Sequence, residues 1–256
     1  MVGIAPDTML GQGVQTARRA IAHGDIGVPM SAQTVMQYPG PDIFHPNPEF
    51  LFARGAGPLF DMGPYYITTL VHIFGPVATV AAVGSKDRAT RTVQVGDRLG
   101  TEFPVDVPTH VSAIAQFAGG GVSQSVFSFQ SPLAKMGVVE ITGTEGTLIL
   151  PDPNAFTGEV KITRALGFAM IRQEPEWEIV PITGALAGRG LGVLDMARSI
   201  RSHTQHLASG ELGYHVLDIL VSIEEAIESR STVEVTSTVE AIPLLSEDWD
   251  PFEATL

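Results

Sequence analysis

The spacing of hydrophobic residues along the chain divides it into helical and extended regions. Near the start, apolar residues three and four positions apart predict a helix over 13–23. A strand is expected over 28–38, followed by a long proline-rich loop over 39–54. A second helix is predicted over 64–74, because Pro64 suits the first turn of a helix, where its missing N–H costs nothing.

From residue 77 onward the hydrophobic spacing falls to two, which is typical of strands with one buried face. Glycine-rich turns at 119–121 and 143–146 are hairpin signals. The predicted strands are, in order, 77–84, 109–117, 122–129, 138–142, 147–150, 159–164 and 177–182. Consecutive hairpins favour a mainly antiparallel sheet.

Helical spacing returns in the last third of the chain. Helices are predicted over 194–208 and 212–229, and a short strand over 232–235 is expected to return to the sheet. No internal repeat or low-complexity tract interrupts the pattern. The predicted fold class is therefore α+β: one domain over 1–256, with a mainly antiparallel open β-sheet and helices packed on one of its faces.

Composition limits the possible functions. The chain has 256 residues, 44% of them hydrophobic, which is enough for a sizeable core. Its net charge of −13 would repel phosphate backbones, so we expect no nucleic-acid partner and favour neutral ligands over polyanions.

Cysteine is absent, which excludes disulfides and thiolate chemistry. No apolar run has the length of a membrane span and no leader opens the sequence, so a soluble, cytoplasmic protein is expected.

Asp61 and Tyr65 form the sharpest candidate for chemistry. They are about one helical turn apart, so both side chains point to the same side. A carboxylate next to a phenol, reached through a glycine-rich turn, suits proton transfer to or from a sugar hydroxyl. A neutral tyrosine, with an ordinary pKa near ~10, is a usable acid and a poor base. Spacing alone favours a plainer explanation: a helix start with an acid on the helix dipole and a packed ring.

The proline-rich loop before this pair carries polar side chains suited to a polyol. His45 and Asn47 lie in its run His-Pro-Asn-Pro-Glu-Phe, and Arg54 stands at its end. Long ordered loops of this kind often carry function. We treat His45, Asn47 and Arg54, together with Tyr66 on the following helix, as candidate substrate-binding residues. An ordinary turn is the alternative explanation of the loop.

Other motifs point to no chemistry. The run from Gly11 to Thr16 imitates a G-x-G-x-x-G dinucleotide fingerprint, but its third position is threonine and the next strand ends at Tyr38, not at an acid. We interpret it as a helix start. His203 and His206 are spaced for chelation but lack a supporting carboxylate, so no metal site is predicted.

The order of short motifs resembles one known family. The run GAGPLFDMGPYYITTL resembles the G-G-G-x-x-x-D-x-G-x-H/Y motif of the Gfo/Idh/MocA oxidoreductases, which include glucose–fructose oxidoreductase and inositol dehydrogenase. IAHGDIGVP is similar to the family's G-x-I-G turn, HPNPEFLF to the loop before the motif, and VEITGTEGTLILPDPNAFTGEV to its sheet hairpin. The resemblance covers nearly the whole chain.

This resemblance implies a function. Members join a Rossmann domain, which binds NAD or NADP, to an α+β substrate domain, and they oxidise or reduce sugars and polyols by hydride transfer. Asp61 matches the motif's aspartate, and Tyr65 matches the proton-transfer position, where many members have histidine. The family's catalytic lysine lies in a Glu-Lys-Pro motif of the Rossmann domain, and this sequence contains no Glu-Lys-Pro.

The resemblance therefore implies a substrate domain without a Rossmann domain, which is inactive alone, binds no NAD or NADP tightly by itself, and forms a homo-oligomer through its open sheet face. Two alternatives stay open. The chain could be a binding and assembly module whose cofactor domain is supplied in trans, or a cofactor-independent sugar lyase or isomerase that uses Asp61 and Tyr65. The sequence leaves open the identity of the sugar, the choice between NAD and NADP, and the oligomeric state.

Overall fold

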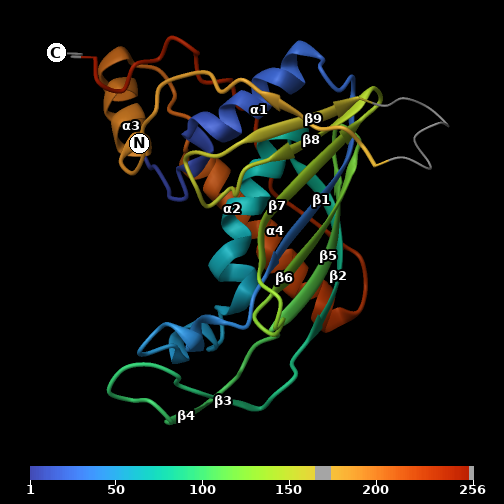
Figure 1. The fold of residues 1–256 in the computed structure, drawn as a ribbon, viewed down its shortest axis with the longest axis vertical. Helices are drawn as coiled ribbons and strands as arrows, with labels where there is room; N and C mark the ends of the chain where they lie inside the picture. Colours follow the sequence, from blue (N-terminus) through green and yellow to red (C-terminus); the bar gives the residue numbers. More distant parts are fainter. Residues whose placement is uncertain (165–173, 254–256) are drawn as a thin grey trace.

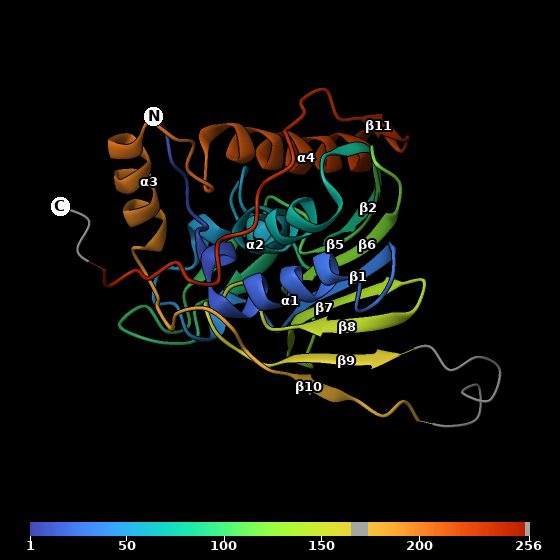
Figure 2. The ribbon, with the colours of Figure 1, turned by 90° about the horizontal axis from the view of Figure 1, so that it is seen from above.

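A curved nine-stranded sheet with helices along one face forms the body of the molecule. The computed structural model describes residues 1–164 and 174–253. Within them the strands lie in the order β10-β9-β8-β7-β1-β6-β5-β2-β11. Helices α1 (Gln12–His23), α2 (Gly57–Phe74) and α4 (Gly210–Ser229) cover one face of the sheet, and the other face is open (Figures 1 and 2).

Every strand predicted from the hydrophobic pattern is present, with ends shifted by a few residues. The strands of the main sheet are β1 (Pro29–Gln37), β2 (Val77–Ser85), β5 (His110–Phe117), β6 (Val122–Ser128), β7 (Lys135–Gly143), β8 (Gly146–Leu150), β9 (Val160–Arg164), β10 (Glu178–Val180) and β11 (Val233–Glu234).

The predicted fold class is wrong about the sheet, which is mixed. β1 pairs in parallel with β6 and antiparallel with β7, so a parallel pair lies at the centre of the sheet. β6 and β7 follow one another in the chain but do not form a hairpin, because β1 lies between them. Hairpin signals in a sequence report only on neighbouring strands, and a strand inserted between two antiparallel strands must run parallel to one of them.

The alternation within each strand decides which side chains meet the helices. On β5, Val111, Ala113 and Ala115 are buried under the helices, whereas Ile114 on the opposite side is 57% exposed. The helices meet them with apolar side chains such as Leu70 of α2, and Ile219 of α4. The core therefore lies between the sheet and its three covering helices. No helix among the described residues is both long and apolar enough to cross a membrane.

A small lobe extends from one end of the sheet, and the sequence pattern gave no sign of its strands. It combines the proline-rich loop, with two short 3-10 helices, η2 (Pro41–Ile43) and η3 (Glu49–Leu51), and a two-stranded sheet of β3 (Thr90–Thr92) and β4 (Glu102–Pro104). β3 and β4 have one buried side chain each, Arg91 and Phe103, so no repeated apolar alternation marks them in the sequence. Figure 1 shows this lobe below the start of α2.

Two helix boundaries also differ from the prediction. α2 begins at Gly57, so that Pro64 is inside the helix and Asp61 is in its second turn, not at its mouth. The proline of the first turn is Pro58. Helix α3 (Leu191–Ser202) ends before the predicted 208, because His203 adopts the left-handed conformation that closes a helix.

Candidate active site at the start of helix α2

The start of α2 is set by one glycine. Gly57 has φ +83°, and a Cβ at this position would lie 2.9 Å from Val107 Cγ2 and 3.2 Å from the carbonyl oxygen of Pro108. Only glycine combines this backbone conformation with such a close approach. The helix can therefore begin directly against the segment that leads into β5, and this placement fixes the position of Asp61 one turn later.

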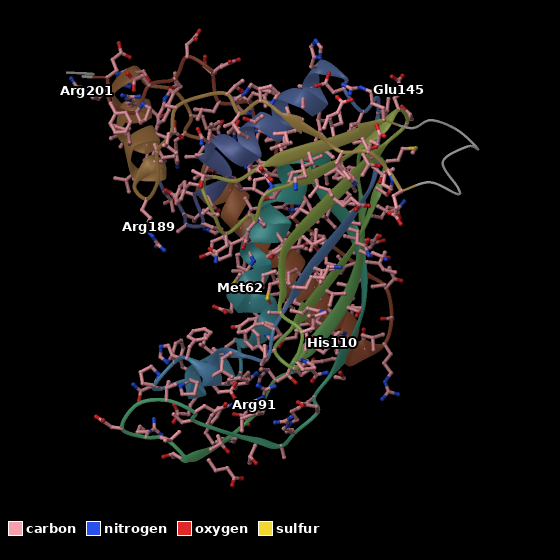
Figure 3. The ribbon with its side chains drawn as sticks, viewed as in Figure 1. Met62, Arg91, His110, Glu145, Arg189 and Arg201 are labelled. Carbon is pink, nitrogen blue, oxygen red and sulfur yellow. The ribbon has the colours of Figure 1, made fainter. Side chains whose placement is uncertain are left out.

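Asp61 and Tyr65 are both half-buried, one turn apart on α2. Burial raises the pKa of the Asp61 carboxyl above its ordinary value, because a buried carboxylate loses its hydration. Within the described part of the chain, neither the Asp61 carboxyl nor the Tyr65 hydroxyl has a hydrogen-bond partner. Both groups are thus available to a hydroxyl of a bound molecule. Figure 3 shows the neighbouring Met62 on the same helix.

Tyr38, directly after β1, is a candidate site residue that the sequence pattern did not single out. Its side chain is buried, and its pKa is raised first by burial and then by the negative charges of Asp61 and Asp42. The Tyr38 phenol therefore stays protonated at neutral pH, and the strand that it follows, β1, lies beside the helix of Asp61. Tyr38 is the last residue of a predicted strand and directly precedes the loop over 39–54, which carries candidate substrate-binding residues. This position is the sequence signal that could have pointed to it.

Two of the predicted substrate-binding residues lie in the lobe. His45 is half-buried; its Nδ1 accepts a hydrogen bond of 3.1 Å from the backbone N–H of Asn47, and its ring contacts Phe50 edge-on at 5.3 Å. The side-chain oxygen of Asn47 accepts a hydrogen bond of 3.2 Å from Arg98, in the connection between β3 and β4. The lobe itself thus holds both residues in place.

The other two predicted substrate-binding residues have different surroundings. Arg54 is exposed just before α2. Tyr66 is fully buried, its ring edge-on against Phe127 at 5.8 Å, and its hydroxyl accepts a hydrogen bond of 2.8 Å from the N–H of Gly137 on β7. Tyr66 therefore faces the sheet, and this structure leaves it no exposed surface for a substrate.

A buried ion pair holds the lobe against the sheet. Arg91 on β3 donates a hydrogen bond of 2.8 Å to the carboxylate of Asp42, and the two side chains are only 4% and 5% exposed. The same guanidinium donates to the carbonyl oxygens of Pro39 at 2.6 Å and Phe129 at 2.5 Å. It also lies over the ring of Phe52, 5.1 Å from the centroid. One side chain thus connects β3, the proline-rich loop and the end of β6 (Figure 3).

The glycines that imitate a dinucleotide fingerprint do not fit a pyrophosphate. A Cβ at Gly11 would lie 2.3 Å from the carbonyl oxygen of Phe156, and one at Gly13 would lie 2.7 Å from Pro151. The segment after β8 therefore covers the start of α1, where a phosphate would have to lie. Across residues 1–164 and 174–253, no three His, Asp or Glu side chains come together as they would around a metal ion.

Comparisons with known proteins agree with the motif order. Residues 14–149 match the family model described as the GFO/IDH/MocA C-terminal domain. A comparison with curated protein sequences found no match.

Solved structures share the fold at low sequence identity. An NAD-binding oxidoreductase from Klebsiella pneumoniae is 22% identical with a TM-score of 0.71, covering 91% of this chain and 66% of that one. Levoglucosan dehydrogenase in complex with NADH and L-sorbose is 22% identical with a TM-score of 0.72, covering 90% of this chain and 65% of that one. Aldose-aldose oxidoreductase from Caulobacter crescentus, complexed with glycerol, is 16% identical with a TM-score of 0.69, covering 91% of this chain and 63% of that one.

The chain spans about two thirds of the length of the structures it matches. The predicted fold class also stated that this chain has no Rossmann domain. About nine tenths of the chain matches an NAD-binding oxidoreductase and a dehydrogenase in complex with NADH. The statement that a Rossmann domain is absent is therefore withdrawn.

Proposed function

Because this chain belongs to the Gfo/Idh/MocA family of oxidoreductases, we propose that it binds a sugar or polyol and exchanges a proton with one of its hydroxyls during a nicotinamide-dependent oxidation or reduction at that carbon. The observation that carries the proposal is the pair on α2. Asp61 and Tyr65 match the motif by sequence and lie one turn apart, and neither the carboxyl nor the phenol hydroxyl has a hydrogen-bond partner among the described residues.

The two residues take different parts in this proposal. The Asp61 carboxylate accepts a hydrogen bond from the sugar hydroxyl and orients it. The Tyr65 hydroxyl gives its proton to the same oxygen in the direction of reduction, and the phenolate that this leaves takes a proton back in the direction of oxidation. Burial around Asp61 raises its pKa and strengthens its hydrogen bond to a neutral ligand. Tyr38 keeps its proton, because burial and the negative charge of Asp61 raise its pKa, and its hydroxyl is a further donor for the sugar.

The proposal assigns no residue of this chain to the cofactor. The two covered glycines at the start of α1 do not fit a pyrophosphate, so the chemistry proposed for Asp61 and Tyr65 is limited to the hydroxyl and its proton. We also propose that the 256-residue chain alone reduces NAD⁺ or NADP⁺ only slowly with any sugar. Rapid formation of NADH or NADPH by the purified chain, followed by absorbance with a sugar panel, would contradict this part.

Sugar affinity tests the main proposal. Isothermal titration of the chain with a panel of aldoses and alditols should give a measurable Kd, and Asp61→Asn should weaken it about tenfold through loss of a charge-assisted hydrogen bond. Tyr65→Phe should weaken affinity by less, because a hydrogen bond between neutral groups contributes less. Tyr214→Phe, an exposed tyrosine on α4, is the matched control. Equal affinities for the wild type and Asp61→Asn would reject the proposal.

A cofactor-independent lyase or isomerase is the alternative use of the same residues. It predicts conversion of sugars or keto-sugars without added cofactor, at a rate that falls in Tyr65→Phe. Equal rates in the two proteins would reject a role of Tyr65 in such a reaction.

We further propose that the open sheet face pairs two copies of the chain. Exposed apolar side chains lie across it, among them Val83, Ile114 and Val122. A shallow hollow of about 850 Å³ overlies β1, β2, β5 and β6, and its lining includes Val83 and Ile114. Contiguous exposed apolar surface of this kind is typical of protein interfaces.

A further inference from the structure

Phe44 is an exposed aromatic residue in an otherwise well-packed loop. It follows η2, and its side chain is 60% exposed although its neighbours Pro41 and Asp42 are buried. A phenylalanine in this position leaves much of its ring in water, which costs free energy unless something covers it.

The ring of Phe44 ends a column of aromatic side chains. It stacks on Tyr38, with 6.2 Å between centroids and 22° between ring planes. Tyr38 in turn contacts Phe129 edge-on at 5.2 Å, and Phe129 contacts Phe52 at 5.7 Å. The inner members of the column are buried, so Phe44 is its single strongly exposed member among these four.

This column reaches the candidate active site through Tyr38. Tyr38 directly follows β1, which lies beside α2, the helix that carries Asp61. The inner end of the column also lies at the start of α2, because the carbonyl oxygen of Phe52 accepts a hydrogen bond of 2.9 Å from the N–H of Asp106, and the next residue, Val107, lies against Gly57. The exposed ring of Phe44 is therefore the outer end of a column whose inner end lies beside the helix of the candidate site.

The loop that carries Phe44 is held rigidly. Asp42, two residues earlier, forms the buried ion pair with Arg91, and Gln94 donates a further hydrogen bond of 3.1 Å to its carboxylate. The backbone N–H of Phe44 donates to the carbonyl oxygen of Pro41 at 3.2 Å. Such a surface is preorganised, so a ligand that covers it loses little free energy to loop ordering.

We propose that Phe44, stacked on Tyr38, is a platform for the C–H face of a sugar ring, and that it makes the site selective for ring-form sugars over open-chain polyols. A pyranose presents a flat set of C–H groups that can cover an aromatic ring, whereas a flexible alditol has no fixed face of this kind. The inference rests on the proposed function and narrows its substrate class.

Phe50 provides a matched control in the same loop. It is 59% exposed, almost the same as Phe44, but it packs against His45 and is not part of the aromatic column. A nonspecific effect of removing an exposed phenylalanine should therefore occur at both positions, and a platform effect only at Phe44.

The test measures the Kd of the 256-residue chain for a panel of aldopyranoses and for the alditols made by reducing each of them. Phe44→Ala should raise the Kd for the pyranoses about tenfold and that for the alditols by less than about twofold. Phe44→Tyr should retain pyranose binding. Phe50→Ala, which removes the contact with His45, should change the Kd by a smaller factor than Phe44→Ala and by the same factor for pyranoses and alditols. Circular dichroism checks that each variant is folded.

The outcomes separate the two proposals. If the wild type binds neither class of sugar, the proposed function fails, and the platform with it. If the wild type binds sugars but Phe44→Ala leaves pyranose affinity unchanged, or weakens pyranoses and alditols equally, or acts no more strongly than Phe50→Ala, only the platform is overturned.

Discussion

At the scale of single residues, Asp61 combines a candidate functional position with a cost to stability. Its pKa is raised in the folded protein by burial, so the ionised carboxylate is less favourable there than in the unfolded chain. The stabilising effect of the raised pKa is present only below the unfolded pKa, near ~3.9, and is lost as the pH rises through the folded pKa.

Asp61→Asn should therefore be more stable than the wild type at neutral pH, and the difference should shrink as the pH falls from the folded pKa to the unfolded pKa. Urea unfolding at several pH values, followed by circular dichroism, measures it. The same variant should bind sugar more weakly, so that stability and affinity change in opposite directions. A variant less stable than the wild type at neutral pH would contradict the assigned cause of the shift.

Residue types in the sequence pointed to Asp61 and Tyr65 as candidates but did not point to Tyr38. The spacing of Asp61 and Tyr65 lies within one helix, where sequence separation fixes geometry. Tyr38 is brought toward α2 only because β1 lies beside that helix in the folded chain, and no local pattern records this arrangement. For the same reason, the inward direction of Tyr66 became visible only from its hydrogen bond to Gly137.

At the scale of elements, the start of α2 depends on Gly57 more than on Gly55. Both have positive φ, +83° and +82°, but a Cβ at Gly55 would meet nothing within 4 Å, whereas one at Gly57 would meet Val107 and Pro108. Gly55→Ala should cost about 1 kcal/mol from backbone conformation, and Gly57→Ala about 2–4 kcal/mol because the steric contact adds to it. Equal losses of unfolding free energy would contradict the close approach.

The lobe depends on the buried pair of Arg91 and Asp42. Arg91→Ala should lower the free energy of unfolding by about 3–5 kcal/mol, because it leaves the Asp42 carboxylate buried without a partner. Arg98→Ala removes the exposed pair with Glu49 in the same lobe and should cost at most about 1 kcal/mol. Guanidinium chloride titrations compare the two variants, and similar losses would reject the structural role of Arg91.

At the scale of the whole molecule, the open sheet face should decide the oligomeric state. Ile114→Asp places a charge on this face and should shift the chain toward monomers, as measured by light scattering after gel filtration. Leu217→Asp, at a residue 51% exposed on α4, is the control on the helical side and should leave the oligomeric state unchanged. A wild-type chain that is monomeric at high concentration would contradict the proposed pairing.

Contiguous residues were enough to specify which segments form strands and helices and which family they resemble. The hydrophobic period, the turn glycines and the motifs can be read from short stretches of sequence. Each depends on residues that are close together in the chain, where local sterics and hydrogen bonding determine the structure. Folding of the whole chain was needed to place β1 between β6 and β7, to bring Arg91 to Asp42, and to pack Tyr38, on which Phe44 stacks, against Phe129. These contacts join residues distant in the chain, and they form only when folding the whole sheet offsets the entropy of closing the intervening loops.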